Sequence, residues 1–189
     1  IDIPEIDDYK RVFTETSRII IIGCGSSWHA GLIGEHLIES LANVNVEVEY
    51  ASEFRHRSPI INNKDLVIAI SQSGETVDTL AALKLANEKG AFTYSLVNAF
   101  GSTIARNSDI VSYINSGVEV GVASTKAFIG QVIFLLLIAL KIGRIKNNIK
   151  AKEYQSIITQ ISNLPELIQK SFVSNMLMKE ISDKYSDKN

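Results

Sequence analysis

One stretch decides the fold of this chain, and it reads Ala69-Ile70-Ser71-Gln72-Ser73-Gly74-Glu75-Thr76-Val77-Asp78-Thr79. The apolar run at residues 66–70 predicts a buried strand, and a helix-like pattern follows the loop. A strand, a hydroxyl-rich loop and a helix in this order form a unit that can bind phosphate without a lysine.

The loop of this unit carries donors that suit an anion. The start of the helix offers free N–H groups and the positive end of the helix dipole. Ser71, Ser73 and Thr76 add three hydroxyls, and Gly74 lets the backbone approach a ligand closely. A helix cap would need only one hydroxyl, such as that of Thr76, so the pattern favours an anion site over a simple cap.

Composition places the chain among ordinary globular proteins. Of its 189 residues, 46% are apolar and 21% are charged, and the formal net charge is -2. A charge so close to neutral argues against a nucleic-acid binder. The single cysteine, Cys24, cannot form an internal disulfide and indicates a reducing, cytoplasmic compartment. We expect no secretory signal, and no membrane span, because the longest apolar run, residues 132–140, falls short of about 20 residues.

Apolar runs alternate with helical patterns along residues 18–143. Strands are predicted at 19–22, 44–50, 66–70, 91–97 and 110–114, and helices at 26–41, 76–89 and 124–142. Gly90 and Gly143 stand where glycines end helices. The alternation predicts an α/β fold with a five-stranded parallel sheet and helices on both faces. Ligands of such sheets bind beyond the carboxyl ends of the strands.

The character of the chain changes after Gly143. Residues 144–189 are rich in Lys, Asn, Ser and Asp and show no strand pattern. One helical face gathers five apolar residues: Tyr154, Ile157, Ile158, Ile161 and Leu164. Pro165 is expected to interrupt that helix, with another helix or two at 167–185. We therefore expect a helical extension and not a second domain.

A second loop, Gly23-Cys24-Gly25-Ser26-Ser27, directly follows the first predicted strand. The third glycine of a dinucleotide-binding fingerprint would fall at Trp28, so that fingerprint fails, and no Gly-Lys-Ser/Thr marks a Walker-type loop. What remains is a tight turn that presents Ser26 and Ser27 at a helix start, where capping and ligand binding are equally compatible. Because both loops follow parallel strands, we expect this one to form a second wall of the same pocket.

A third segment opens the apolar helix, and it reads Glu119-Val120-Gly121-Val122-Ala123-Ser124-Thr125-Lys126-Ala127-Phe128. Ser124 or Thr125 is a natural N-cap, while Gly117 and Gly121 allow backbone contact with the hydroxyls of a ligand. Lys126 lies at the wrong end of the helix dipole and calls for an anionic partner, for which Glu119 is a candidate. Capping and ligand contact both stay open here.

Other reactive residue types point to structural roles. Cys24 is expected to be a buried small apolar side chain and not a nucleophile. The histidines, His29, His36 and His56, are separated, and no cluster of cysteines or carboxylates lies near them at ligand spacing, so we predict no metal site. The charged cluster at residues 53–57 is expected to be a solvated face or a subunit contact.

Together these segments resemble the sugar isomerase (SIS) domain family, and within it the first SIS domain of the isomerizing glutamine–fructose-6-phosphate aminotransferases, the glucosamine-6-phosphate synthases. The likeness rests on the three segments above and on Ala51-Ser52-Glu53-Phe54-Arg55, and it covers roughly residues 18–143. It implies an SIS-type three-layer sandwich at 18–143. Residues 1–17 would be a lead-in segment and 144–189 a helical connector toward a second SIS domain.

The resemblance also implies roles for single residues. The phosphate of fructose 6-phosphate or glucosamine 6-phosphate would be held by Ser27, Ser71, Gln72, Ser73 and Thr76, with Ser26 beside them at the helix start. Val122, through its backbone, and Ser124 would contact the sugar. Gly25, Gly74, Glu119 and Lys126 would support these contacts. The family uses no metal and no organic cofactor, and it assembles its sugar site in a homodimer.

Catalytic residues are not expected in this chain. The resemblance places the catalytic glutamate, the Schiff-base lysine and the ring-opening histidine in a second SIS domain, which no segment here matches. Two alternatives stay open. One is an SIS-family amino-sugar-phosphate deaminase or deglycase without a glutaminase domain. The other is a non-catalytic sugar-phosphate sensor, although no basic helix pair for DNA binding is visible.

Overall fold

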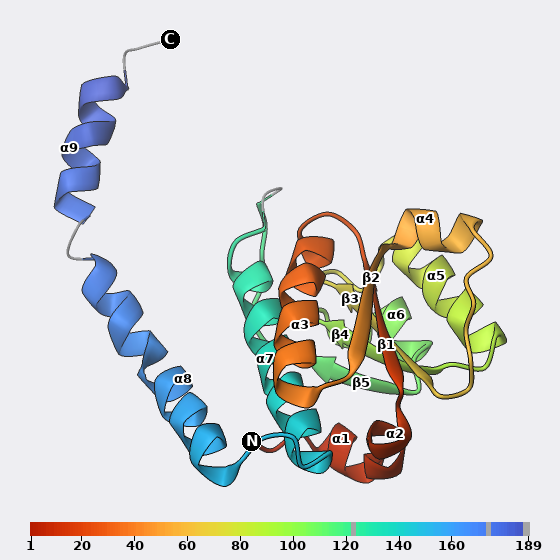
Figure 1. The fold of residues 1–189 in the computed structure, drawn as a ribbon. Helices are drawn as coiled ribbons and strands as arrows, with labels where there is room; N and C mark the ends of the chain where they lie inside the picture. Colours follow the sequence, from red (N-terminus) through yellow and green to blue (C-terminus); the bar gives the residue numbers. More distant parts are fainter. Residues whose placement is uncertain (122–123, 173–174, 187–189) are drawn as a thin grey trace. The chain divides into compact units, whose positions relative to one another are not determined.

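Five parallel strands form the centre of the computed structural model, which describes residues 1–121, 124–172 and 175–186. They are β1 (Arg18–Gly23), β2 (Asn45–Tyr50), β3 (Asp65–Ser71), β4 (Phe92–Val97) and β5 (Ile110–Tyr113). The sheet order is β2-β1-β3-β4-β5, and each pairing is parallel (Figure 1). Each strand end lies within one residue of the end that the apolar runs predict.

Burial explains why the central strands could be predicted from the sequence. All seven residues of β3 are buried, and so are five of the six in β1 and in β4. A parallel strand covered on both faces must be apolar throughout, which gives a continuous run and no alternation. The edge strand β2 is only partly buried and its sequence alternates accordingly.

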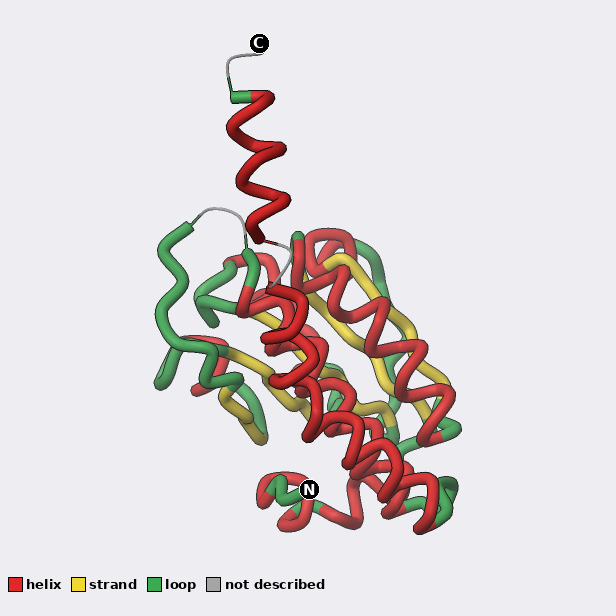
Figure 2. The backbone as a smooth tube through the Cα atoms, turned by 90° about the vertical axis from the view of Figure 1, so that its left-hand side faces the viewer, coloured by secondary structure: helices red, strands yellow, loops and turns green. Residues whose placement is uncertain are grey.

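Helices cover both faces of the sheet (Figure 1). On one face lie α3 (Ser26–Ala42) and α7 (Lys126–Ile145), with the short α1 (Pro4–Asp8) and α2 (Lys10–Glu15). On the other face lie α4 (Ala51–His56), α5 (Val77–Glu88) and α6 (Thr103–Arg106). Figure 2 views the molecule from the side of α3 and α7. The result is the predicted α/β three-layer arrangement, in which residues 1–149 form one compact unit.

The helices α3 and α7 pack side by side through glycines. A methyl group at Gly34 of α3 would lie 2.8 Å from Cδ1 of Leu135, and one at Gly143 of α7 would collide with the carbonyl oxygen of Leu41. The two contacts follow each other in the same direction along both helices, so the helices run parallel. Gly143 is therefore a packing residue inside α7. The prediction that it ends the helix is wrong, since α7 continues to Ile145.

By length and composition α7 could cross a membrane. The core helix of a globular domain passes the same test. Here eight of the helix's residues are buried, and its apolar side chains pack with α3 and the sheet.

Residues 150–189 form a second unit. It contains α8 (Ala151–Ser171) and α9 (Asn175–Tyr185). Pro165 lies inside α8, so the predicted interruption is wrong. The proline removes one backbone donor, and the turns on either side keep the helix going. The apolar face from Tyr154 to Leu164 is present at the predicted helical spacing.

Candidate functional site

Two of the three predicted loops lie side by side at the carboxyl edge of the sheet. β1 and β3 are neighbours, and their last paired residues are Gly23 and Ile70. The turn after β1 is tight, because a methyl group at Gly23 would lie 3.2 Å from the backbone nitrogen of Trp28 and 3.4 Å from the carbonyl oxygen of Ile70. The loop of Ser26 and Ser27 therefore adjoins the loop of Ser71 to Thr76, as expected for one pocket.

The loop after β3 is braced by its own hydroxyls. Ser71 is 2% exposed, and its Oγ accepts a hydrogen bond from the N–H of Gly74 at 3.0 Å and lies 3.0 Å from Oγ1 of Thr76. The Oγ of Ser73 accepts from the N–H of Glu75 at 3.2 Å. When Ser71 donates to Thr76, the hydroxyl protons of Thr76 and Ser73 are both left for an incoming acceptor.

Backbone hydrogen bonds from two neighbouring segments also hold this loop. The carbonyl oxygen of Gln72 accepts from the N–H groups of Asn98 and Ala99 at 3.1 and 3.2 Å. The carbonyl oxygen of Gly74 accepts from Ile104 at 2.9 Å. Gly74 has φ +65°, and a side chain there would collide with Ser102. Only glycine fits this backbone and this space.

Glu75 caps α6. One of its carboxylate oxygens accepts from the N–H of Thr103 at 2.8 Å. Hydrogen bonds from Thr103 lower the pKa of Glu75 below its ordinary value. The helix that follows the loop, α5, has Thr76 at its N-cap with no hydrogen bond from that side chain, so its first N–H groups are not capped by Thr76. These donors and the helix dipole favour an anion at this position.

The loop after β1 is held by a residue that lies far away in the sequence. Ser27 is 6% exposed in the first turn of α3, and its Oγ accepts a hydrogen bond from Nε2 of Gln131 at 3.0 Å. Gln131 belongs to α7. Sequence reasoning missed Gln131, although a lone amide in an apolar helix was a signal. Ser26 beside it is half-buried, and Gly25 takes φ +57° at the N-cap of α3.

The third segment is organised by Glu119. One carboxylate oxygen accepts from the N–H of Thr125 at 2.8 Å, and the other accepts from the hydroxyl of Ser124 at 3.0 Å. Hydrogen bonds to the carboxylate, first that from the Thr125 backbone, lower the pKa of Glu119. Glu119 thus caps α7, and neither Ser124 nor Thr125 does so with its own side chain. Val122 lies outside the described residues.

Glu119 was a candidate partner for Lys126, but the ion pairs of the described residues do not join the two. Among the described residues the Glu119 carboxylate is engaged by Ser124, Thr125 and Ala127. Lys126 is exposed in the first turn of α7, where its Nζ would lie 3.9 Å from a methyl group at Gly117.

Asn98 joins the residues just before the third segment to the loop after β3. Its side chain donates to the carbonyl oxygen of Gly117 at 2.8 Å and accepts from the N–H of Ser116 at 2.9 Å, while its backbone N–H bonds Gln72. A cavity of about 470 Å³ lies here, with Gln72, Asn98 and Glu119 in its lining. Sequence reasoning missed Asn98, because its partners come from two other segments.

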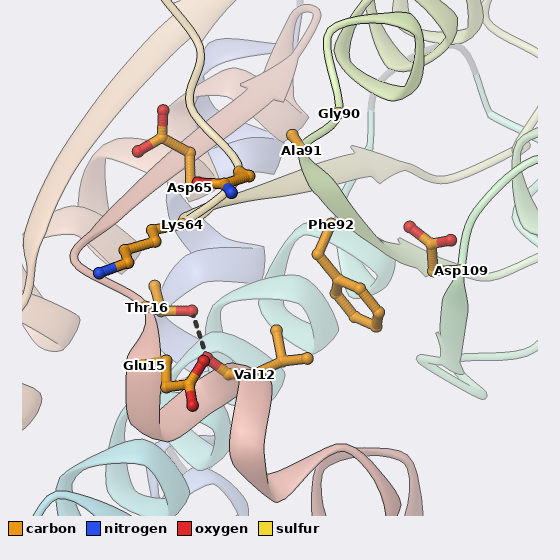
Figure 3. Close-up of a pocket in the computed structure, with 10 residues that line it drawn as sticks. Val12, Glu15, Thr16, Lys64, Asp65, Gly90, Ala91, Phe92 and Asp109 are labelled. Carbon is orange, nitrogen blue, oxygen red and sulfur yellow. Dashed lines mark hydrogen bonds between the residues drawn. The ribbon is translucent and has the colours of Figure 1, made fainter.

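Another pocket lies at the opposite edge of the sheet. Figure 3 shows Glu15, Lys64, Phe92 and Asp109 around it, near the amino ends of β3 and β4. Its volume is about 280 Å³. It contains none of the predicted site residues. The described residues contain no group of three or more His, Cys, Asp or Glu side chains that could hold a metal ion.

A five-stranded parallel sheet with hydroxyl-rich loops at its carboxyl edge defines the class of domain. The chain belongs to the SIS domain family, whose model matches residues 13–141.

Two relatives are similar to this chain over most of its length. The chain is 50% identical over 179 residues to a glutamine–fructose-6-phosphate aminotransferase (isomerizing) of Bacteroides thetaiotaomicron, covering 95% of this chain and 29% of that protein. It is 48% identical over 182 residues to the enzyme of the same name from Chlorobaculum tepidum, covering 96% and 30%. The chain therefore spans about 30% of the length of these relatives.

A solved structure agrees with the sequence relatives. The C-terminal domain of glucosamine-fructose-6-phosphate aminotransferase from Francisella tularensis superimposes with a TM-score of 0.89 at 35% identity. The match covers 95% of this chain and 51% of that domain.

Proposed function

We propose that this chain is the sugar-phosphate-binding half of the isomerase domain of a glutamine–fructose-6-phosphate aminotransferase. The whole enzyme would convert fructose 6-phosphate and glutamine to glucosamine 6-phosphate and glutamate. The observation that carries the proposal is the hydroxyl-rich Ser71 to Thr76 loop at the carboxyl end of β3, beside Ser27 at the end of β1. The names of the relatives supply the substrate.

In this proposal the phosphate is held by the hydroxyls of Ser27, Ser73 and Thr76, with Ser26 and Gln72 beside them. Ser71 orients Thr76 through their hydrogen bond. The sugar would then extend toward Ser124 and the backbone of Val122, with Glu119 fixing Ser124. Gly25 and Gly74 provide the backbone conformations of the two loops.

The chemistry would be carried out elsewhere. We assign no catalytic residue to this chain and propose that residues 144–189 connect it to a second SIS domain with the proton-transfer groups. The chain by itself would then bind the sugar phosphate without turning it over, and the whole enzyme would act as a cytoplasmic homodimer. Formation of glucosamine 6-phosphate by this polypeptide alone would contradict the assignment.

Thermal melting tests the binding role. Fructose 6-phosphate at 100 times its dissociation constant should stabilise the chain by about 2.7 kcal/mol, whereas fructose should have no effect. Ser73→Ala should blunt the shift, because the exposed hydroxyl of Ser73 would donate to the phosphate. Ser162→Ala, which removes an exposed serine hydroxyl from α8, serves as the control. An equal shift in wild type and Ser73→Ala would count against the site.

A further inference from the structure

Gln131 is a buried amide on the apolar face of α7. It is 1% exposed, and the other buried residues of α7 are all apolar or glycine: Ala127, Leu135, Ile138, Ala139, Leu140, Ile142 and Gly143. Burying an amide is unfavourable unless its polar atoms find partners. Leucine or methionine at this position would satisfy the core, so the amide calls for a reason other than packing.

Its one hydrogen bond within the described residues reaches the candidate site. Nε2 donates to the Oγ of Ser27, a residue 104 positions earlier in the chain. Oε1 of Gln131 is buried without a hydrogen-bond partner among the described residues. The amide thus bears a desolvation cost at one atom while its other atom contacts the serine.

Close packing fixes the amide in place. A methyl group at Gly130 would collide with Cγ2 of Ile114, so α7 approaches the end of β5 as closely as its backbone permits. One turn further along, Leu135 packs into the space left by Gly34 of α3. The first contact holds α7 against the end of β5 and the second holds it against α3, and Gln131 lies between them along the helix.

The bond determines what the serine can do. A serine hydroxyl has one proton to donate and two lone pairs that accept. Because the amide N–H occupies a lone pair of Ser27 and cannot accept its proton, the hydroxyl proton is left to donate elsewhere. An anion between the loops after β1 and β3 needs donors of this kind.

We propose that Gln131 is a positioning residue, which holds the hydroxyl of Ser27 as a hydrogen-bond donor toward a phosphate ester bound between these two loops. This inference rests on the proposed function. It adds a residue from outside the loops, on a helix that follows the last strand of the sheet.

A double-mutant cycle tests the proposal. Dissociation constants of fructose 6-phosphate are measured by calorimetry on the whole chain as wild type, Ser27→Ala, Gln131→Met and the double variant. Ser27→Ala should weaken binding about tenfold, the effect of losing one hydrogen bond to a charged group. Gln131→Met should weaken it about threefold to tenfold, but by less than about twofold when Ser27 is already alanine, because the two residues act as one unit.

A second substitution reverses the polarity of the contact. Gln131→Glu keeps the size of the side chain and offers Ser27 an acceptor, so the serine proton turns toward the helix. Binding should weaken at least as much as in Ser27→Ala. Leu140→Met, at a buried position nine residues further along the same helix, is the matched control, and it should leave the dissociation constant unchanged.

The possible results distinguish a failure of the proposed function from a failure of this inference. If the wild type does not bind fructose 6-phosphate, the proposed function fails. If the wild type binds and Ser27→Ala binds more weakly, but the folded Gln131 variants bind as well as or better than wild type, this inference alone is overturned. The same holds if Gln131→Met weakens binding equally in the presence and absence of the Ser27 hydroxyl, since that result would indicate a general packing effect.

Discussion

The two loops at the carboxyl edge reach similar chemistry by different means. The loop after β3 is braced within six residues, because the Oγ of Ser71 bonds the N–H of Gly74 and lies against Thr76. The loop after β1 depends on Gln131, a residue from a helix 104 positions further along the chain. The contacts inside the loop after β3 can be recognised in the sequence, whereas the tertiary contact that holds Ser27 cannot. The two should also respond differently to substitution.

The glycines of the two loops should give the largest difference. Both have positive φ, +65° at Gly74 and +57° at Gly25, but a side chain at Gly74 meets Ser102 while one at Gly25 meets nothing within 4 Å. Gly74→Ala should therefore lower the free energy of unfolding by about 2–4 kcal/mol, from strain plus overlap. Gly25→Ala should cost about 1–2 kcal/mol, from backbone strain alone. Urea unfolding of both variants measures this, and equal losses would contradict the difference in bracing.

Within the loop after β3, the two serines should separate stability from binding. Ser71→Ala leaves the N–H of Gly74 without its partner in a buried setting and should cost about 1–3 kcal/mol of folding stability. Ser73 is exposed, so Ser73→Ala should change the free energy of unfolding by no more than about 0.5 kcal/mol. The same substitution should weaken the binding of fructose 6-phosphate. Chemical denaturation with a parallel titration distinguishes the two. A large stability loss in Ser73→Ala would show that its hydroxyl is structural.

Acid should loosen the third segment, with an effect smaller than those of the substitutions above. The pKa of Glu119 is lowered in the folded chain, so its carboxylate adds stability above the ordinary glutamate pKa of about 4.3. That stability is lost as the pH falls through the lower folded pKa. Melting temperatures measured from pH 6 to pH 3 should fall less steeply in Glu119→Gln than in wild type. Identical slopes would mean that the cap on α7 does not depend on charge.

The strands of the sheet were predictable because each one is marked by a pattern in its own residues. Central parallel strands are covered on both faces, and runs such as Ile19 to Ile22 cannot be mistaken for alternating strands. The short helix α4 was not predicted, because residues 51–56 make less than two turns and carry little periodic pattern. Pro165 misled the prediction of α8, since one missing hydrogen bond does not end a helix of 21 residues.

The candidate site was predictable only where its contacts are local. The Ser71 to Thr76 loop and the Ser26–Ser27 turn follow strands, and their sequences name the donors. Asn98 and Gln131 were missed, because each acts on a residue far away in the sequence. The sequence named Lys126 as a candidate partner of Glu119 and missed the actual one, because a carboxylate six residues before Thr125 can fold back onto the helix start as easily as it can pair with Lys126.

Amide chemical-shift mapping with fructose 6-phosphate shows which residues hold the phosphate. We expect the shifts to concentrate at residues 25–28 and 71–77, the two loops at the carboxyl ends of β1 and β3, and fructose to produce none of them. Shifts confined to the pocket of Figure 3, around Glu15, Lys64 and Asp109 at the opposite edge of the sheet, would contradict it.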